Sequence, residues 1–320
     1  MKISVICPAF NGAPHLDQLM DFFVNALPAD KELLYVDGMS KDGSREMVQE
    51  WSKKHPNIHL IDNPKKYVPF GLNKAIRQAK GEYIARLDAH TEYPNDYFEK
   101  CLRILQKSGA DNVGGYIVSK GKTTVGKAIA VAMSSQFGVG NSEFRTELTD
   151  RFVDTVPFGF WKREAFDKFG LFDEELMRNQ DDEFNYRTNK LGGKIFLSSE
   201  IKSEYYVRDS YKAMFKQYYE YGVYKPLVFK KLGNEGVRIR HIVPIGFSLY
   251  LMTSVAACWF WWWSLPFLLY LLLNIIFSFK STESLLVKLF TIPAYTLLHL
   301  AYGLGFGVGM WRWRKRKILQ

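Results

Sequence analysis

Short apolar runs alternate with amphipathic stretches over the first hundred residues of the chain. The apolar runs are rich in β-branched and aromatic residues and predict strands at residues 2–7, 33–36, 58–61 and 83–87. Between them, apolar residues recur at helical spacing and predict helices at residues 16–25, 44–53 and 71–79. Strands that alternate with helices form right-handed βαβ units, so we expect an α/β domain with a mostly parallel sheet.

The same pattern continues with longer gaps in the next hundred residues. It predicts a strand at residues 112–118 and helices at residues 96–107, 162–169 and 181–191. Residues 121–141 are rich in small side chains, and we expect this segment to be mobile and to lie near the functional site.

The last quarter of the chain has a different character. No charged side chain occurs in the 38 residues from 242 to 279, a length that suits two membrane spans with a break near Pro266. Tryptophans cluster at that break, as at a membrane interface: Trp259, Trp261, Trp262 and Trp263. The second piece, residues 265–279, covers about 22 Å as a helix, short of a hydrocarbon core of about 30 Å. A third apolar stretch, residues 285–311, is interrupted by Lys288 and Pro293.

The basic tail raises a question of membrane topology. It follows the third apolar stretch and reads as cytoplasmic by the positive-inside rule: Arg312, Arg314, Lys315, Arg316 and Lys317. A cytoplasmic N-terminal domain and a cytoplasmic tail require an even number of crossings, whereas the apolar stretches number three. Either one stretch is interfacial or re-entrant, or the tail lies outside. Residues 205–231 are rich in Tyr and Lys and suit a membrane interface; the alternative is a soluble helix packed on the sheet.

Charge and cysteine content narrow the class of protein. The net charge is +10, but the last 80 residues hold seven basic and one acidic side chain, so the basic excess accompanies the apolar stretches. This distribution argues against a purely soluble protein and against a general nucleic-acid binder. Cys7, Cys101 and Cys258 form no CxxC pair, so the sequence indicates no zinc site. An odd and small number of cysteines also argues against a disulfide scaffold and fits a reducing compartment. The first apolar run is too short for a signal peptide, so we expect the N-terminal part in the cytoplasm.

Polar residues follow three of the predicted strands. Asn11 comes after the first strand, Asp37 after the second and Asp88 after the fourth. Ligands of parallel sheets bind beyond the carboxyl ends of the strands, so we expect these three side chains at one edge. Asp37 can accept a hydrogen bond from a base N–H or a ribose hydroxyl; the alternative for this loop is an Asx turn with a helix cap. No GxGxxG follows the first strand, which argues against a Rossmann dehydrogenase.

Two acidic clusters can carry chemistry. Asp88 and His90 lie two residues apart at a strand end and can face one divalent cation, which would neutralise a leaving diphosphate. The alternative is a turn with a surface histidine. Asp181, Asp182 and Glu183 open a predicted helix, where acids suit the helix dipole. A carboxylate in a cleft could instead act as a general base.

Four motifs occur in an order that resembles one enzyme family. They are PAFN, VDGMSKDGS, GLNKAIRQAKGEYIARLDAH and FGLFDEELMRNQDDEFNYR, within about residues 2–211. The series resembles the family-two glycosyltransferases of the GT-A fold, a Rossmann-like α/β fold that binds nucleotide-diphospho-sugars. The stretch HLAYGLGFGVG, from His299 to Gly309, is similar to the membrane-bound bacterial exopolysaccharide branch of succinoglycan type.

The resemblance implies roles for the matching residues. The nucleotide-binding set is Pro8, Ala9, Asn11, Asp37 and Asp88, with the first three lining the nucleobase pocket. The metal set, which would hold Mg²⁺ or Mn²⁺, is Asp88 and His90. The catalytic base that deprotonates the acceptor hydroxyl is Asp181, or Asp182 because Gln180 stands where a glutamate is usual.

The sequence also departs from the family pattern. His90 replaces the usual second aspartate of the metal motif, and Gly38 replaces the second acid of VDDGS. Leu72 stands where an arginine usually precedes Asn73. No QxxRW motif follows, which argues against a processive synthase.

The resemblance implies an inverting, metal-dependent, non-processive hexosyltransferase. It would move a sugar from a UDP-linked donor to a lipid-linked glycan in exopolysaccharide or capsule assembly. We expect a multi-pass cell-membrane protein with a cytoplasmic GT-A catalytic domain at residues 1–211, interfacial amphipathic helices at 212–240 and a membrane region with its tail at 241–320. The alternatives are a polyprenyl-phosphate glycosyltransferase and a non-catalytic membrane scaffold. We expect no nucleic-acid partner, and the sequence leaves the oligomeric state open.

Overall fold

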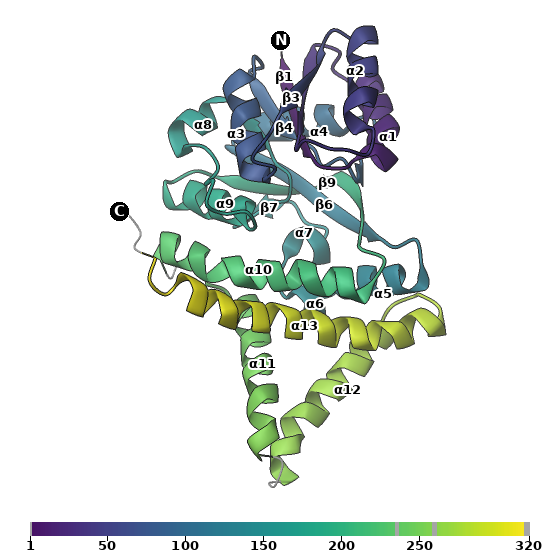
Figure 1. Ribbon diagram of the computed structural model, residues 1–320, viewed down its shortest axis with the longest axis vertical. Helices are drawn as coiled ribbons and strands as arrows, with labels where there is room; N and C mark the ends of the chain where they lie inside the picture. The colour runs from purple at the N-terminus through teal and green to yellow at the C-terminus, as the bar shows by residue number, and fades with distance from the viewer. Residues whose placement is uncertain (1, 234–236, 258–260, 317–320) are drawn as a thin grey trace. The chain divides into compact units, whose positions relative to one another are not determined.

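The chain divides into two compact units. The computed structural model describes residues 2–233, 237–257 and 261–316 (Figure 1). The first unit comprises Met1–Val118 and Glu147–Tyr205, and the second comprises Ser119–Thr146 and Tyr206–Gln320. Residues 119–146 thus belong with the C-terminal helices, although they lie inside the range expected for the catalytic domain. Cys258, Trp259 and Lys317, which enter the sequence predictions, lie outside the described residues.

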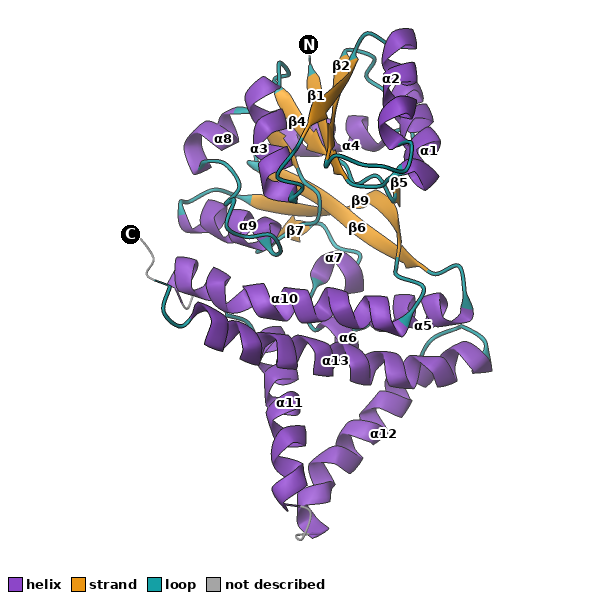
Figure 2. Cartoon of the chain, viewed as in Figure 1, coloured by secondary structure: helices purple, strands orange, loops and turns teal. Residues whose placement is uncertain are grey.

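Four parallel strands form one half of the sheet in the first unit. They are β1 (Ile3–Ala9), β2 (Lys31–Asp37), β3 (Ile58–Asp62) and β4 (Tyr83–Arg86), arranged in the order β3-β2-β1-β4 (Figure 2). All residues of β2 and β4 are buried, because helices cover both faces of this part of the sheet. The four strands were predicted from sequence and are confirmed, as is the common edge at which Asn11, Asp37 and Asp88 follow them.

The other half of the sheet is mixed. It continues from β4 through β8 (Phe160–Lys162), β6 (Asn112–Lys120), β9 (Ile195–Tyr206) and β5 (Thr91–Glu92), and β7 (Arg151–Phe152) pairs with β9. The pairings of β4 with β8 and of β8 with β6 are antiparallel. Strand β9 was not predicted, because only some of its twelve residues are buried and its sequence reads as polar. Tyr205, the first residue of the segment for which an interfacial position was expected, lies in this strand, one residue before its end at Tyr206.

The predicted helices of this unit are confirmed to within a few residues at each end. They are α1 (Ala13–Asn25), α2 (Ser44–Lys54), α3 (Val68–Gln78), α4 (Tyr97–Ser108), α8 (Glu164–Phe169) and α9 (Gln180–Lys190). Figure 2 shows α1 and α2 on one side of the parallel strands and α3 and α8 on the other.

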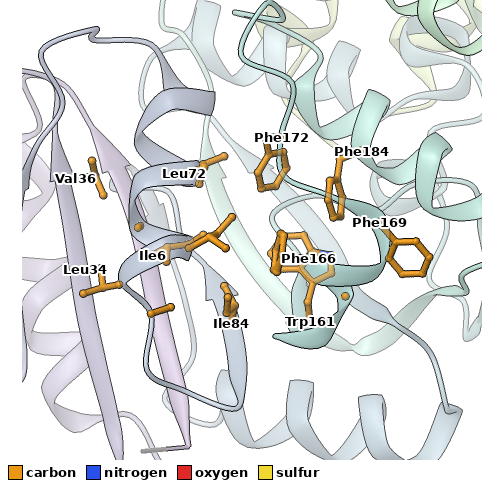
Figure 3. Packing of buried hydrophobic residues seen from close by; sticks show 14 of the residues in the cluster. Ile6, Leu34, Val36, Leu72, Ile84, Trp161, Phe166, Phe169, Phe172 and Phe184 are labelled. Carbon is orange, nitrogen blue, oxygen red and sulfur yellow. The ribbon is translucent and has the colours of Figure 1, made fainter. Parts of the chain in front are cut away.

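An aromatic core anchors α9 to the sheet. Alternate strand residues such as Ile6, Val36 and Ile84 point to one face, where they meet α3 (Figure 3). A cluster of large rings completes this core: Trp161, Phe166, Phe169, Phe172 and Phe184. Phe184 lies on α9 and is fully buried, which stabilises the fold by about 1.5–3 kcal/mol. The N-terminal half of α9 is therefore packed against this core.

The second unit is entirely helical in its described part, apart from the ends of two strands. It contains α5 (Thr124–Met133), α6 (Gln136–Val139), α7 (Glu143–Thr146), α10 (Tyr211–Leu232), α11 (Ile239–Ala257), α12 (Leu265–Phe279) and α13 (Leu285–Trp313). The segment 121–141, for which we expected mobility, folds into α5 and α6. Ala128, Ile129 and Ala132 on α5 are buried, and α5 packs against α13.

Glycines bring α10 and α13 into close contact. The two helices lie side by side (Figure 1), and α13 presents Gly305 and Gly309 to α10. A Cβ atom at Gly305 would overlap the Tyr219 carbonyl, and one at Gly309 would overlap the Val223 carbonyl. The HLAYGLGFGVG stretch therefore serves helix packing, because glycine alone lets the two backbones approach this closely.

Helices α11 and α12 run away from α13 and converge at a short 3₁₀-helix, Trp261–Ser264 (Figure 1). Among the described residues, two helices are long and apolar enough to cross a membrane: Trp261–Phe279 and Leu285–Trp313. They differ in burial, since 11% of the most apolar stretch is buried in the former and 39% in the latter. The former thus presents most of its apolar side chains outward, whereas the latter shares its surface with neighbouring helices.

Candidate active site

The loops that follow β1 and β2 are tied to each other. Ala9 and Asp37 are register partners, and the Gly38 N–H donates to the Ala9 carbonyl at 2.8 Å. Asn11 has a positive φ of 51°, which asparagine tolerates; its N–H donates to Ser40 Oγ at 2.8 Å, and its Oδ1 accepts from the Lys41 N–H at 3.2 Å. Pro8 and Ala9 thus end β1 beside Asp37, and Asn11 fastens the two loops together.

Asp37 is fully buried at the end of β2. Its Oδ2 accepts from the Ser40 N–H at 2.9 Å and from Arg45 Nη1 at 2.7 Å. Its Oδ1 has no hydrogen-bond partner among the described residues. A buried acceptor without a donor costs free energy, and a ligand that brings an N–H or O–H to this oxygen would recover it.

Gly38 packs closely against the loop that follows β1. A Cβ there would lie 3.2 Å from the Phe10 ring and 3.3 Å from the Ala9 carbonyl oxygen. A side chain would therefore press on the β1 loop.

Asp88 and His90 follow β4 at the same edge. The Asp88 N–H donates to the Tyr93 hydroxyl at 2.9 Å, and the Asp88 side chain is 23% exposed. The His90 ring packs edge-on against Tyr205, with centroids 5.2 Å apart. Within residues 2–233, 237–257 and 261–316, no group of three or more His, Cys, Asp or Glu side chains could hold a metal ion. A carboxylate and an imidazole are donors that Mn²⁺ accepts, and Asp88 and His90 are the residues at this edge that could provide them.

Arg86 joins β4 to the first turn of α9. Its buried guanidinium forms an ion pair with Asp181, and its Nη2 lies 3.9 Å from Asp88 Oδ1. The Asp181 side chain is 34% exposed and so remains accessible to a ligand. Burial raises the pKa of Asp181, while the positive charge of Arg86 opposes that rise.

The other acids of the cluster behave differently. Glu183 is buried and accepts from Arg187 Nε at 2.7 Å, while Arg187 Nη2 donates to the Leu171 carbonyl at 2.8 Å. Glu183 therefore supports the fold, together with the buried Gln180. Asp182 is half-buried and has other contacts. The structure brings Asp181 to Arg86 and Asp88.

A buried polar network fixes the position of α9. Asn185 Nδ2 donates to Thr155 Oγ1 at 2.8 Å and to the Val156 carbonyl at 3.1 Å, and its Oδ1 accepts from Asn112 Nδ2 at 3.0 Å. These bonds join α9 to β6 and to the loop before β8. Asp181 thus stands on a helix that both apolar packing and hydrogen bonds hold in place.

Sequence reasoning missed Arg86 and Arg45. Arg45 Nη1 and Nη2 bind Asp37 and Asp62, each at 2.7 Å, so Arg45 orients the candidate base-binding acid. A signal for Arg86 was present, because it is the one charged residue inside an otherwise apolar predicted strand. A charge placed in a buried strand needs a partner, and that partner is found in the acidic cluster of α9.

Comparison with known sequences gives consistent matches. The sequence profile of the family described as "Glycosyl transferase family 2" matches residues 4–170. The chain is 32% identical to the succinoglycan biosynthesis protein ExoA of Rhizobium meliloti over 221 residues, 68% of this chain and 67% of that protein. It is 28% identical to a dolichyl N-acetyl-alpha-D-glucosaminyl phosphate 3-beta-D-2,3-diacetamido-2,3-dideoxy-beta-D-glucuronosyltransferase of Methanococcus voltae, over 79% of this chain and 81% of that one.

Solved structures share the fold at low sequence identity. The mannosyltransferase PcManGT from Pyrobaculum calidifontis, in complex with GDP-Man and Mn²⁺, matches with a TM-score of 0.61 and 17% identity over 98% of this chain and 88% of its own. TarS of S. aureus in complex with UDP-GlcNAc matches with a TM-score of 0.55 and 16% identity, over 98% of this chain and 92% of that one. The expected GT-A fold is thereby confirmed.

Proposed function

Because the chain belongs to glycosyl transferase family 2, we propose that it transfers a sugar, with inversion, from a nucleotide-sugar donor to a lipid-linked glycan. Relatives with glycosyltransferase names support its action on nucleotide sugars in polysaccharide or glycan biosynthesis. We further propose that the donor is UDP-linked, that transfer depends on a divalent cation, and that the acceptor is a sugar hydroxyl in exopolysaccharide or capsule assembly. Since the chain is a glycosyltransferase, the non-catalytic scaffold is set aside.

The observation that carries this proposal is the ion pair between Arg86 and Asp181 beside Asp88. It keeps a partly exposed carboxylate at the strand edge where Asp37 offers an unpaired acceptor. Asp37, which can bind the nucleotide, and Asp181, which can accept a proton, thus lie at the same edge of the sheet. That division of roles is what transfer from a nucleotide sugar to a hydroxyl requires.

The reaction follows from these positions. The acceptor oxygen attacks the anomeric carbon, a new carbon–oxygen bond forms, and the bond to the diphosphate oxygen breaks. Asp181 takes the proton that leaves the acceptor hydroxyl, and Arg86 keeps its carboxylate oriented. Attack occurs opposite the leaving group, so the anomeric centre is inverted and no covalent enzyme intermediate forms.

Asp88 and His90 are the residues that would hold a divalent cation, Mg²⁺ or Mn²⁺. Both lie at the strand edge, and each has a side chain suited to such an ion. When bound, the ion supplies positive charge that neutralises a diphosphate. The complex of PcManGT with Mn²⁺ supports this part of the proposal for a protein of the same fold.

A polyprenyl phosphate is the alternative acceptor. Phosphate is already ionised at neutral pH and needs no base, whereas a sugar hydroxyl must lose its proton during attack. A carboxylate held in place by Arg86 therefore favours the hydroxyl acceptor. The missing QxxRW motif supports transfer of single sugars.

We also propose that α11 and α12 enter the membrane and that α13 stays at the cytoplasmic surface beside α10. The 19 residues Trp261–Phe279 cover about 28 Å, close to the hydrocarbon thickness, and the exposed Trp261 and Trp262 mark the far interface. The close glycine contacts commit one side of α13 to α10. A hairpin that enters and returns supports an even number of crossings, with the catalytic unit and the basic tail in the cytoplasm.

The test uses the full chain in detergent with a panel of nucleotide sugars and a lipid-linked glycan. We expect nucleoside diphosphate release that depends on the acceptor, and loss of about 10²-fold or more of that rate in Asp181→Asn. Asp182→Asn is the matched control on the same helix and retains activity. An active Asp181→Asn enzyme with an inactive Asp182→Asn enzyme would assign the base to Asp182.

A further inference from the structure

A basic cavity lies within the second unit, at the end of α12. Its volume is about 530 Å³, and it is lined by α5, by the end of β6 and by the turn between α12 and α13. Three lysines line it, Lys120, Lys127 and Lys280, against one acid, Glu283. The lining therefore carries a net positive charge and suits an anion.

The polar groups around the lysines match the needs of a phosphate. The hydroxyl-bearing residues Ser119, Ser281 and Thr282 also line the cavity, and Arg145, which is not a lining residue, donates from Nη1 to Ser119 Oγ at 3.1 Å. Phosphate offers several acceptor oxygens, which ammonium groups and hydroxyls satisfy together.

Tyr295 gives a second, independent indication of a ligand. It lines the cavity and is fully buried. By distance and angle its hydroxyl has no hydrogen-bond partner among the described residues, although the side chain of Ser135, another lining residue, lies close to it. An unsatisfied buried hydroxyl costs free energy, which an acceptor atom bound in the cavity would recover.

The surroundings of the cavity indicate that the phosphate belongs to a lipid. Apolar side chains are exposed along α12 up to Phe279, and Leu285 and Leu286 are exposed at the start of α13. Lys280 follows Phe279 directly, and its ammonium lies 4.6 Å from the ring of Phe277, another lining residue. An apolar surface that ends at a basic cavity fits an amphiphile whose phosphate lies next to a hydrocarbon chain.

We propose that this cavity binds the phosphate group of the lipid that carries the acceptor glycan. The inference rests on the proposed function, because that function supplies a lipid-linked acceptor. The cavity then holds the acceptor's lipid end at the surface of the membrane, and the glycan extends from it.

The experiment measures binding and transfer separately, with the full chain in phosphatidylcholine nanodiscs. The binding probe is a radiolabelled polyprenyl diphosphate, with phosphatidylglycerol as competitor. We expect Lys127→Glu and Lys280→Glu each to weaken binding by about tenfold or more, and Lys→Arg at the same positions to retain it. Lys216→Glu, an exposed lysine of α10 outside the cavity, is the matched control and binds normally. Phosphatidylglycerol is expected to compete weakly.

The transfer measurement separates the two proposals. We expect both charge reversals to raise the KM for the lipid-linked acceptor about tenfold and to leave the KM for the donor unchanged. If the charge-reversal variants bind the probe as tightly as wild type and still transfer the sugar, the cavity assignment is overturned and the proposed function stays intact. Lysine-dependent binding without transfer would support the cavity and count against the function. Equal competition by phosphatidylglycerol would overturn the assignment to the acceptor lipid. Unchanged thermal unfolding of each variant shows that the fold is kept.

Discussion

Arg86 on β4 and Asp181 on α9 form an ion pair across 95 positions of sequence, and Arg86 Nη2 lies 3.9 Å from Asp88. We predict that Arg86→Met lowers kcat by about 10²-fold, because a general base that shifts by an ångström loses about that much rate. Arg103→Met is the control: it removes an exposed ion pair with Glu200 and is expected to change kcat less than twofold. Steady-state kinetics with a saturating donor measure both. A normal rate for Arg86→Met would mean that the ion pair does not position the base.

Asp37→Asn should weaken donor binding. The substitution removes the charge from the buried acceptor, and a hydrogen bond to a charged group is worth about 1.5–3 kcal/mol, or about 10- to 10²-fold in affinity. We expect a higher donor KM at nearly unchanged kcat. Asp62→Asn removes the other carboxylate of Arg45, which is 55% exposed, and should leave the donor KM within about twofold. Equal effects of the two variants would assign the role of Asp37 to the Arg45 ion pair alone.

Removal of divalent cations should stop transfer. A chelator is expected to abolish nucleoside diphosphate release, and added Mn²⁺ to restore it, because Asp88 and His90 are the proposed ligands. In His90→Ala, we expect the Mn²⁺ concentration for half-maximal rate to rise about tenfold, as for the loss of one ligand interaction. His55→Ala, on a loop between α2 and β3, is the control. Full activity in the presence of a chelator would refute the metal proposal.

Asn185→Ala should destabilise the catalytic unit. It leaves Asn112, Thr155 and the Val156 carbonyl without their buried partner, and each unsatisfied group costs about 1–3 kcal/mol. We expect a clear fall in Tm by thermal denaturation. Asn25→Ala removes an exposed bond to the Asp21 carbonyl and should shift Tm little. A comparable Tm for the two variants would show that the network contributes little to stability.

Gly305→Ala should weaken the contact between α10 and α13. Its Cβ would overlap the Tyr219 carbonyl, and overpacking of this kind costs about 1–3 kcal/mol. Gly307→Ala, two positions further on the same helix, meets nothing within 4 Å and should be neutral or slightly stabilising. Thermal unfolding of the detergent-solubilised chain compares the two. Similar Tm values would place the helices further apart than described.

The parallel half of the sheet could be predicted because β1, β2 and β4 are buried on both faces, and because Ile58, Leu60 and Ile61 give β3 an apolar run. Such strands read as continuous apolar runs, and the residues that follow them must share one edge. Asn11, Asp37 and Asp88 were therefore located correctly from sequence. Strand β9 was missed because Glu and Lys occupy its exposed positions and Ser occupies two of its buried ones, so no apolar run marks it.

Contacts between segments far apart in the sequence could not be predicted from the local pattern of residues. Arg86 was visible as a charge within a strand, but its partner depends on where α9 packs, and the aromatic core around Phe184 decides that. The assignment of residues 119–146 to the second unit is of the same kind. The small residues of α5 are buried because α5 packs against α13, which lies more than 150 residues further along the chain.

The glycine contact between α10 and α13 also has a consequence for the order of events during synthesis. The ribosome makes α10 first, then α11 and α12, and only afterwards the helix whose glycines receive α10. On the proposed topology, the hairpin reaches the lipid before α10 has its lasting neighbour. Insertion would then precede completion of the second unit, and a chain that missed the membrane would keep the partner face of α10 uncovered until α13 was made.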